Sequence, residues 1–231
     1  MATEIQEPLM RRRPPAELHS GDRMTQSEFH AVYEQTPEKF KAELIAGRVY
    51  VSSPLKADHG ENTSPINAVL LLYEANTPGV RVLENATIIL SEEDEVQPDV
   101  FLRILPEHRG NSSLSDKGYI HGPPELVVEV AYSSRSIDLN DKRTQYATHG
   151  VLEYLVLNLR DERLHWFDLK ANQELQPDAD GVCRIHTFPG LWINSAALVN
   201  RDLRPLLKTL EEGLASSEHA AFVADLAARK R

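Results

Sequence analysis

The run Leu126–Ala131 (LVVEVA) constrains the fold of this chain more than any other segment. It is continuously apolar except for Glu129, which is typical of a central strand buried on both faces of a sheet. A carboxylate inside such a strand is costly unless it has a partner. Glu129 therefore predicts one of two partners. A neighbouring Lys or Arg side chain would give it a purely structural role, and a bound metal ion would give it a functional one.

A second carboxylate has a similar setting. Asp99 follows Pro98 at the head of an apolar run, and we expect a strand over Val96–Ile104. Pro-Asp is also common in turns, so Asp99 alone is a weak signal. Two carboxylates on adjacent strands are a stronger one, because Mg²⁺ binds one or two carboxylates together with water and substrate phosphate.

The segment after the Glu129 strand predicts a helix from about Asp138 to His149, which folds back across that strand. Asp138, Lys142 and Tyr146 recur at i, i+4 and i+8 and share one face of this helix. Its first turn would place Lys142 near Glu129. The alternative is a capping aspartate, a solvated lysine and a packing tyrosine.

Glu43 is a further candidate, at the start of a predicted hairpin around Ala46-Gly47. A lone Glu at such a position is more often a surface residue. Upstream, Thr25 and Glu28 form a capping box that begins a helix. A second helix is expected to begin at Ser64-Pro65, with Ser as N-cap and Pro in the first turn.

The order of expected elements predicts one mixed α/β domain. Residues 1–23 are interpreted as a flexible tail, residues 24–200 as the domain, and residues 201–231 as a C-terminal helical extension. No apolar run is long enough to span a bilayer. The single cysteine, Cys183, excludes an internal disulfide framework and favours the cytoplasm.

The net charge of the chain argues against non-specific binding of nucleic acid. Lys and Arg number 25 and Asp and Glu number 35, which gives a net charge of −10. Such a chain is not suited to coating nucleic acid non-specifically, although a local basic patch would still allow an enzyme to act on it. The histidine spacing shows no HxH or HExxH pattern, so a zinc site is not expected.

Taken together, the motifs resemble the Uma-two family, the restriction endonuclease-like proteins of the PD-(D/E)xK nuclease superfamily. The match covers about residues 24–200, with the motifs in the family's order and spacing. Its segments are residues 43–49 (ELIAGRV), Ser53-Pro54 followed by His59, residues 98–100 (PDV), residues 123–130 (PPELVVEV), and Asp138, Lys142 and Tyr146 followed by residues 150–154 (GVLEY).

The resemblance implies a restriction-endonuclease-like mixed β-sheet flanked by helices, and metal-dependent hydrolysis of phosphodiester bonds in DNA. Asp99 and Glu129 would bind Mg²⁺ or Mn²⁺, and Glu43 would be a helper acid. Lys142 would be the catalytic lysine, because the superfamily's usual lysine position, two residues after the Glu, is Ala131 here. His59 would be a neighbour of the site.

The sequence departs from the family at residues 131–134, which read Ala-Tyr-Ser-Ser where the family has Leu-Ser-Pro-Ser.

Two alternatives to the nuclease function stay open. One is a non-catalytic interaction module on the same fold, favoured by the five acids and no Lys or Arg across Ser91–Asp99. The other is a metal-dependent hydrolase of another phosphate ester. In each case we expect a homodimer and no membrane association.

Overall fold

The computed structural model describes residues 17–37, 39–53, 57–132 and 134–230. Its main sheet is mixed, with strand order β12-β11-β10-β9-β6-β3. The strands span Val80–Glu84 (β3), Val100–Ile104 (β6), Leu126–Ala131 (β9), Glu153–Asn158 (β10), Arg163–Asp168 (β11) and Gln173–Leu175 (β12).

Strand β9 is central, as its apolar run predicts, and every residue in it is buried. It pairs in parallel with β10 and antiparallel with β6. Because strand side chains alternate between faces, Val128 and Val130 enter one hydrophobic core while Val127 and Ala131 enter another. Glu129 shares the face of Val127 and Ala131.

Helices cover both faces of this sheet. The core that contains Val128 and Val130 also includes residues of α2 (Ala57–Asn76), α4 (Ser195–Val199), α5 (Leu203–Leu214) and α6 (Ser217–Arg229). On the opposite face lie a π-helical segment, η2 (Ile137–Lys142), and α3 (Arg143–His149). The expected restriction-endonuclease-like arrangement of a mixed sheet flanked by helices is confirmed.

A second sheet, with strand order β2-β1-β5-β4-β8-β7, adjoins η2 and α3. Its strands span Ala42–Ile45 (β1), Arg48–Val51 (β2), Ile88–Ile89 (β4), Glu95–Val96 (β5), Ser113–Leu114 (β7) and Ile120–His121 (β8). The predicted hairpin is present as β1 and β2. Its turn residues Ala46 and Gly47 have φ angles of 50° and 69°, the left-handed values that a tight hairpin turn requires.

Shorter elements complete the chain: α1 (Gln26–Tyr33), the 3₁₀ turn η1 (Pro106–His108), β13 (Val182–Arg184) and β14 (Trp192–Asn194). Both interactions of the predicted capping box are present at α1, whose N-cap is Thr25. Phe29 of α1 packs on the outer face of the hairpin with Leu44 and Val49.

The predicted start of the second helix at Ser64 is wrong, because α2 begins at Ala57 and Pro65 lies inside it. The hydroxyls of Thr63 and Ser64 donate to the carbonyls of His59 and Gly60, so polar side chains support the turns before the proline. The two additional turns carry His59 on the helix and toward the sheet.

The predicted strand Val96–Ile104 is two strands in different sheets. Val96 ends β5 and Val100 begins β6, and the break falls at Gln97-Pro98-Asp99. Proline has no N–H to donate to a strand ladder, which explains the break. The break also leaves Asp99 at the point where the chain crosses from one sheet to the other.

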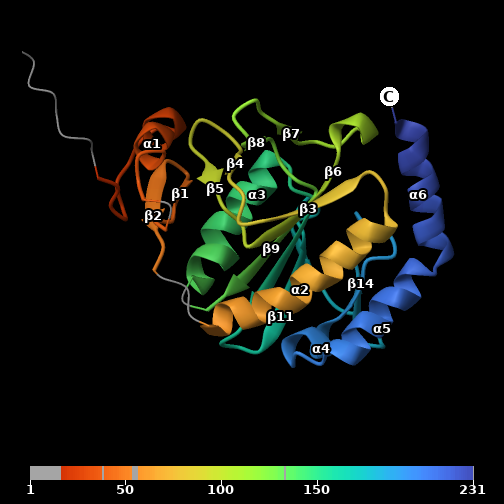
Figure 1. Cartoon of the computed structure of the whole chain (residues 1–231). Helices are drawn as coiled ribbons and strands as arrows, with labels where there is room; N and C mark the ends of the chain where they lie inside the picture. Colours follow the sequence, from red (N-terminus) through yellow and green to blue (C-terminus); the bar gives the residue numbers. More distant parts are fainter. Residues whose placement is uncertain (1–16, 38, 54–56, 133, 231) are drawn as a thin grey trace, which may run out of the picture.

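The C-terminal helices lie on the main core. Leu206 and Leu210 of α5 and Leu226 of α6 are buried in the same cluster as Val128. Figure 1 shows these helices along one side of the molecule and the β1–β2 hairpin on the other. None of the helices in the described ranges combines the length and apolar character needed to cross a membrane.

Candidate active site

Asp99 and Glu129 lie side by side where β6 and β9 meet. The antiparallel register pairs Val100 with Val128, so the next position places Asp99 opposite Glu129. The Asp99 N–H donates to Glu129 Oε2 at 3.3 Å, and the Val130 N–H donates to Asp99 Oδ2 at 2.7 Å. Strand pairing therefore brings the two sequence-predicted metal ligands together.

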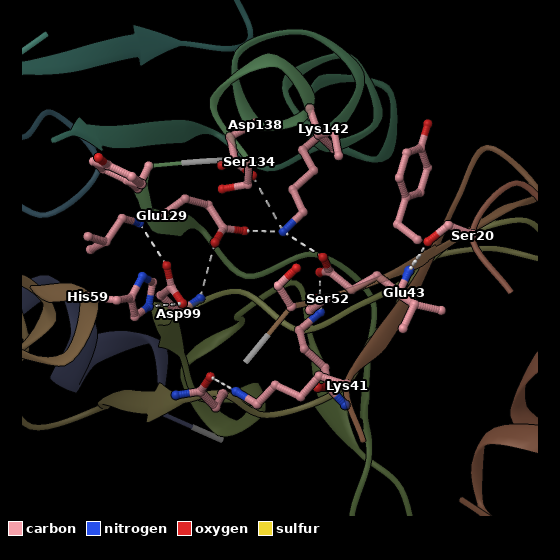
Figure 2. Close-up of a pocket in the computed structure, with 18 of the residues that line it drawn as sticks. Ser20, Lys41, Glu43, Ser52, His59, Asp99, Glu129, Ser134, Asp138 and Lys142 are labelled. Atoms are coloured by element: carbon pink, nitrogen blue, oxygen red, sulfur yellow. Dashed lines mark hydrogen bonds and ion pairs between the residues drawn. The ribbon is translucent and has the colours of Figure 1, made fainter. Parts of the chain in front are cut away.

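Lys142 joins this pair from the opposite layer. Its Nζ lies 2.9 Å from Glu129 Oε1, 2.8 Å from Glu43 Oε2 and 3.7 Å from Asp138 Oδ1 (Figure 2). Lys142 is the last residue of η2, and the turn after β9 folds this segment back across its parent strand. The structure thus provides the lysine partner that Glu129 requires. Lys142 also contacts two further carboxylates, so the charges form a cluster rather than a single ion pair.

Glu43 enters from the hairpin and is largely buried, with 12 % of its side chain exposed. Its Oε1 accepts the Gln97 N–H at 2.8 Å, while Oε2 faces Lys142. Glu43 therefore links the hairpin, the crossover before Asp99 and the lysine. It does not lie on the surface, as a lone Glu at a hairpin start usually does.

Two further residues complete the hydrogen bonding. His59 Nε2 lies 3.0 Å from Asp99 Oδ1, a contact made possible by the additional N-terminal turns of α2. The Tyr146 hydroxyl donates to Glu129 Oε1 at 3.1 Å. Each carboxylate of the Asp99–Glu129 pair is therefore held by side chains from helices as well as by backbone N–H groups.

A cavity of about 640 Å³ opens beside this cluster, and the four carboxylates of Glu43, Asp99, Glu129 and Asp138 line it. Sequence reasoning did not single out several other lining residues: Ser20, Lys41, Tyr50, Ser52 and Asn85. Their sequence positions carry no recognisable motif, and only the packing of the hairpin against β9 and η2 brings them together. Tyr132 is 59 % exposed.

The cluster contains four carboxylates and one lysine, and burial together with their mutual charges shifts several of their pKa values. Burial raises the pKa of Glu129 well above its ordinary value, and Lys142 only partly opposes this. Burial also raises the pKa of Asp138. Burial disfavours the charged form of Lys142, but Glu129, Glu43 and Asp138 outweigh it and raise the pKa of the lysine well above its ordinary value. Lys142 is therefore an ammonium at neutral pH.

The pKa of Asp99 shifts in the opposite direction to those of Glu129 and Asp138. Burial alone would raise its pKa, but the hydrogen bond and charge of His59 and the Val130 N–H lower it overall. The same hydrogen bond to Asp99 raises the pKa of His59. Asp99 is thus better suited than Glu129 or Asp138 to remain ionised beside the cavity.

The donor set fits a hard divalent cation. In the described ranges, no group of three or more His, Cys, Asp and Glu side chains is arranged to hold a metal ion. Mg²⁺, however, is commonly bound by one or two carboxylates and completes its shell with water and phosphate oxygens. Asp99 and Glu129 provide two adjacent carboxylates at a cavity, in a cluster where four carboxylates face one lysine ammonium.

Together, the mixed sheet and its buried carboxylate–lysine cluster define a protein of the restriction-endonuclease-like class. Comparison of the sequence with family models gives the particular family. The model described as Uma2, "putative restriction endonuclease", matches residues 26–197, and the chain belongs to this family.

A solved structure has a similar fold. It is described as a "putative nuclease belonging to DUF820" from Anabaena variabilis ATCC 29413. The TM-score is 0.58 with 12 % sequence identity, and the match covers 83 % of this chain and 99 % of that one. Among curated proteins, none is a significant match.

Proposed function

We propose that this protein is a metal-dependent endonuclease that hydrolyses phosphodiester bonds in DNA, with Asp99 and Glu129 as ligands of Mg²⁺ or Mn²⁺. The observation that carries the proposal is the Lys142 ammonium. An ammonium has three N–H donors, and Glu129 and Glu43 occupy two of them at 2.9 and 2.8 Å. Asp138 Oδ1 lies 3.7 Å from Nζ, beyond hydrogen-bonding distance, so the third donor is left for a water molecule or a phosphate oxygen in the cavity.

The proposed mechanism follows from these positions. A bound divalent cation would supply charge neutralisation at the phosphate and a water of lowered pKa. Lys142, held charged by its carboxylate neighbours, donates a hydrogen bond to the attacking water or to the phosphate oxygen that gains charge. It orients and stabilises but does not remove a proton. Glu43 holds Nζ of this lysine in place.

His59 and Tyr146 act as positioning residues in this proposal. His59 fixes Asp99 Oδ1, and Tyr146 fixes Glu129 Oε1, the oxygen that also receives Lys142. Partners of metal-binding carboxylates orient the ligands, and their loss typically weakens metal binding or activity by about 10- to 100-fold.

The direct test is a cleavage screen of the purified chain on single-stranded, duplex and branched DNA and on RNA. Each substrate is incubated with Mg²⁺, with Mn²⁺ and with EDTA. We expect cleavage of DNA with either metal and none with EDTA. Titration calorimetry with Mn²⁺ measures metal binding separately. Metal binding without cleavage of any nucleic acid would favour a hydrolase of another phosphate ester, and no metal binding would favour an interaction module.

Substitution of Tyr146 by Phe is expected to reduce cleavage and Mn²⁺ affinity by about tenfold, because it removes the hydroxyl that orients Glu129. The matched control is Tyr154→Phe. Tyr154 is also a fully buried tyrosine of this cluster, but its hydroxyl donates to the backbone carbonyl of Asp138 at 3.2 Å.

Each of these variants is expected to lose about 1 kcal/mol of stability with its hydrogen bond. Titration calorimetry with Mn²⁺ separates them, since only Tyr146→Phe is expected to weaken metal binding. Equal metal affinities in the two variants would contradict a positioning role for Tyr146.

Homodimerisation and a cytoplasmic location are also part of the proposal. Exposed leucines on helices support the first, namely Leu71 and Leu72 of α2 and Leu203 of α5, which are 50 %, 45 % and 51 % exposed. The buried thiol of Cys183 is compatible with a reducing compartment. Light scattering after size exclusion measures the oligomeric state.

A further inference from the structure

Positive side chains lie at both ends of the hairpin face that carries Glu43. Side chains at alternate positions of β1 share a face, so Lys41, Glu43 and Ile45 form one row. The register places Tyr50 opposite Glu43 and Arg48 opposite Ile45, and Arg23 forms a bridge with Arg48 at the outer edge of β2. Lys41 and Ile45 are about 13 Å apart along the strand.

These cations differ from Lys142 in their partners. Lys142 is surrounded by carboxylates, whereas Lys41 Nζ donates to a neutral oxygen, Asn85 Oδ1, at 2.6 Å (Figure 2). Arg23 and Arg48 are exposed, and neither has an ion pair with any residue in the described ranges. All three therefore keep positive charge available to an anionic ligand.

The row of cations adjoins the candidate site directly. Lys41 and Tyr50 line the same cavity as Asp99 and Glu129. Burial and a hydrogen bond to Asp141 raise the pKa of Tyr50, and the charges of Arg48 and Arg23 oppose this rise. The two arginines are thus near enough to act on a residue of the cavity wall, on the side opposite to Lys41.

Tyr132 supplies a different kind of contact. It is 59 % exposed, lines the cavity and follows directly after β9, the strand that carries Glu129. An exposed aromatic ring can stack on an unpaired base, whereas bases inside a duplex are already stacked on each other.

We propose that the hairpin face with Lys41, Arg48 and Arg23 binds the phosphates of an unpaired nucleic-acid strand, and that Tyr132 stacks on one of its bases. The strand runs along the hairpin past Glu43, so that one phosphate reaches the cavity. This inference rests on the proposed nuclease function and specifies its substrate as single-stranded nucleic acid or an unpaired segment of it.

The test is fluorescence anisotropy with a fluorescein-labelled single-stranded DNA of about 12 nucleotides, the RNA of the same sequence and the corresponding DNA duplex. EDTA is present, so that cleavage and metal contacts do not contribute. The double variant Arg23→Gln/Arg48→Gln is compared with Arg204→Gln/Lys208→Gln, which removes two exposed positive charges from α5 on the other side of the molecule.

We expect the wild-type chain to bind a single strand more tightly than the duplex. The hairpin variant should lose about tenfold in affinity, and the slope of log Kd against log salt should fall by about 1.4, since each phosphate contact with a single strand contributes about 0.7. The α5 variant should have the same affinity and the same salt slope as the wild-type chain. Tyr132→Ala should weaken single-strand binding about tenfold, and Tyr132→Phe should not.

Several results would overturn the inference. They are tighter binding of the duplex, no binding of either single strand, or equal affinities and slopes for the hairpin and α5 variants. Cleavage assays separate this failure from that of the proposed function. A chain that cuts DNA while the hairpin variant binds normally contradicts only the inference, and a chain that binds through the hairpin but cuts nothing contradicts only the nuclease proposal.

Discussion

Replacement of Lys142 by Met is expected to reduce cleavage by at least about 10²- to 10³-fold, the range seen when one donor to a transition state is removed. It is also expected to destabilise the fold by about 3 to 5 kcal/mol, because Glu129, Glu43 and Asp138 would stay buried without their shared cation. Single-turnover cleavage and urea unfolding measure the two effects separately.

The matched control for this variant is Lys208→Met, since Lys208 is exposed and, among the described residues, forms an ion pair only with Glu212, at 3.6 Å. Its stability should change by no more than about 0.5 kcal/mol, with normal cleavage. Because an unstable protein is also an inactive one, the double variant Lys142→Met/Glu129→Gln provides a further measurement. Removing one buried negative charge should restore part of the stability and none of the activity.

A folded Lys142→Met protein that cleaves at the wild-type rate would rule out the proposed role of this ammonium. Recovery of cleavage in the double variant would lead to the same conclusion, since the lysine would then be needed only to offset Glu129. Circular dichroism establishes which variants are folded under the assay conditions.

Replacement of Asp99 by Asn is expected to abolish the heat of Mn²⁺ binding and to reduce cleavage by more than about 100-fold, the upper end of the range for a residue that only orients a metal ligand. Asparagine keeps the shape of the side chain, and its oxygen can still accept the Val130 N–H that Asp99 Oδ2 accepts at 2.7 Å. The substitution also removes one negative charge from a cluster that contains four carboxylates. Stability should therefore change by about 1 kcal/mol or less.

Asp94→Asn is the matched control for Asp99→Asn. Asp94 is also a buried aspartate that contacts a histidine, with His149 Nε2 2.9 Å from its Oδ2, but it does not line the cavity. Its carboxylate accepts the Ala46 N–H and the Ser91 hydroxyl, so this variant should lose stability and keep metal binding. Undiminished Mn²⁺ heat in Asp99→Asn would exclude Asp99 as a metal ligand.

Helices, strands and turns were predictable from the sequence where the residues that stabilise them lie within one short segment. Thr25 and Glu28 form the predicted capping box, and the Ala46-Gly47 turn closes the predicted hairpin. The apolar run around Glu129 predicts the buried central strand that is observed. In each case the interacting residues are neighbours in the sequence, so their pattern is visible in it.

Other features depend on partners distant in the sequence. Pro65 indicates a helix start, but α2 extends back to Ala57 and thereby brings His59 to Asp99. The spacing of Asp138 and Lys142 predicts an α-helix, whereas the segment is π-helical. Tertiary packing against β9 and the hairpin outweighs these local preferences, because burying a helix contributes more than the preference of one residue.

The sequence alone determined which carboxylates and which lysine were candidates, since acids next to apolar strands require partners and the motif order narrows the family. It could not determine that Glu43, Asp99, Glu129 and Lys142 share one cavity wall. That outcome depends on the pairing of β6 with β9 and on the fold-back of η2. Strand register and the packing between layers are properties of the whole chain, so only the tertiary structure decided the site.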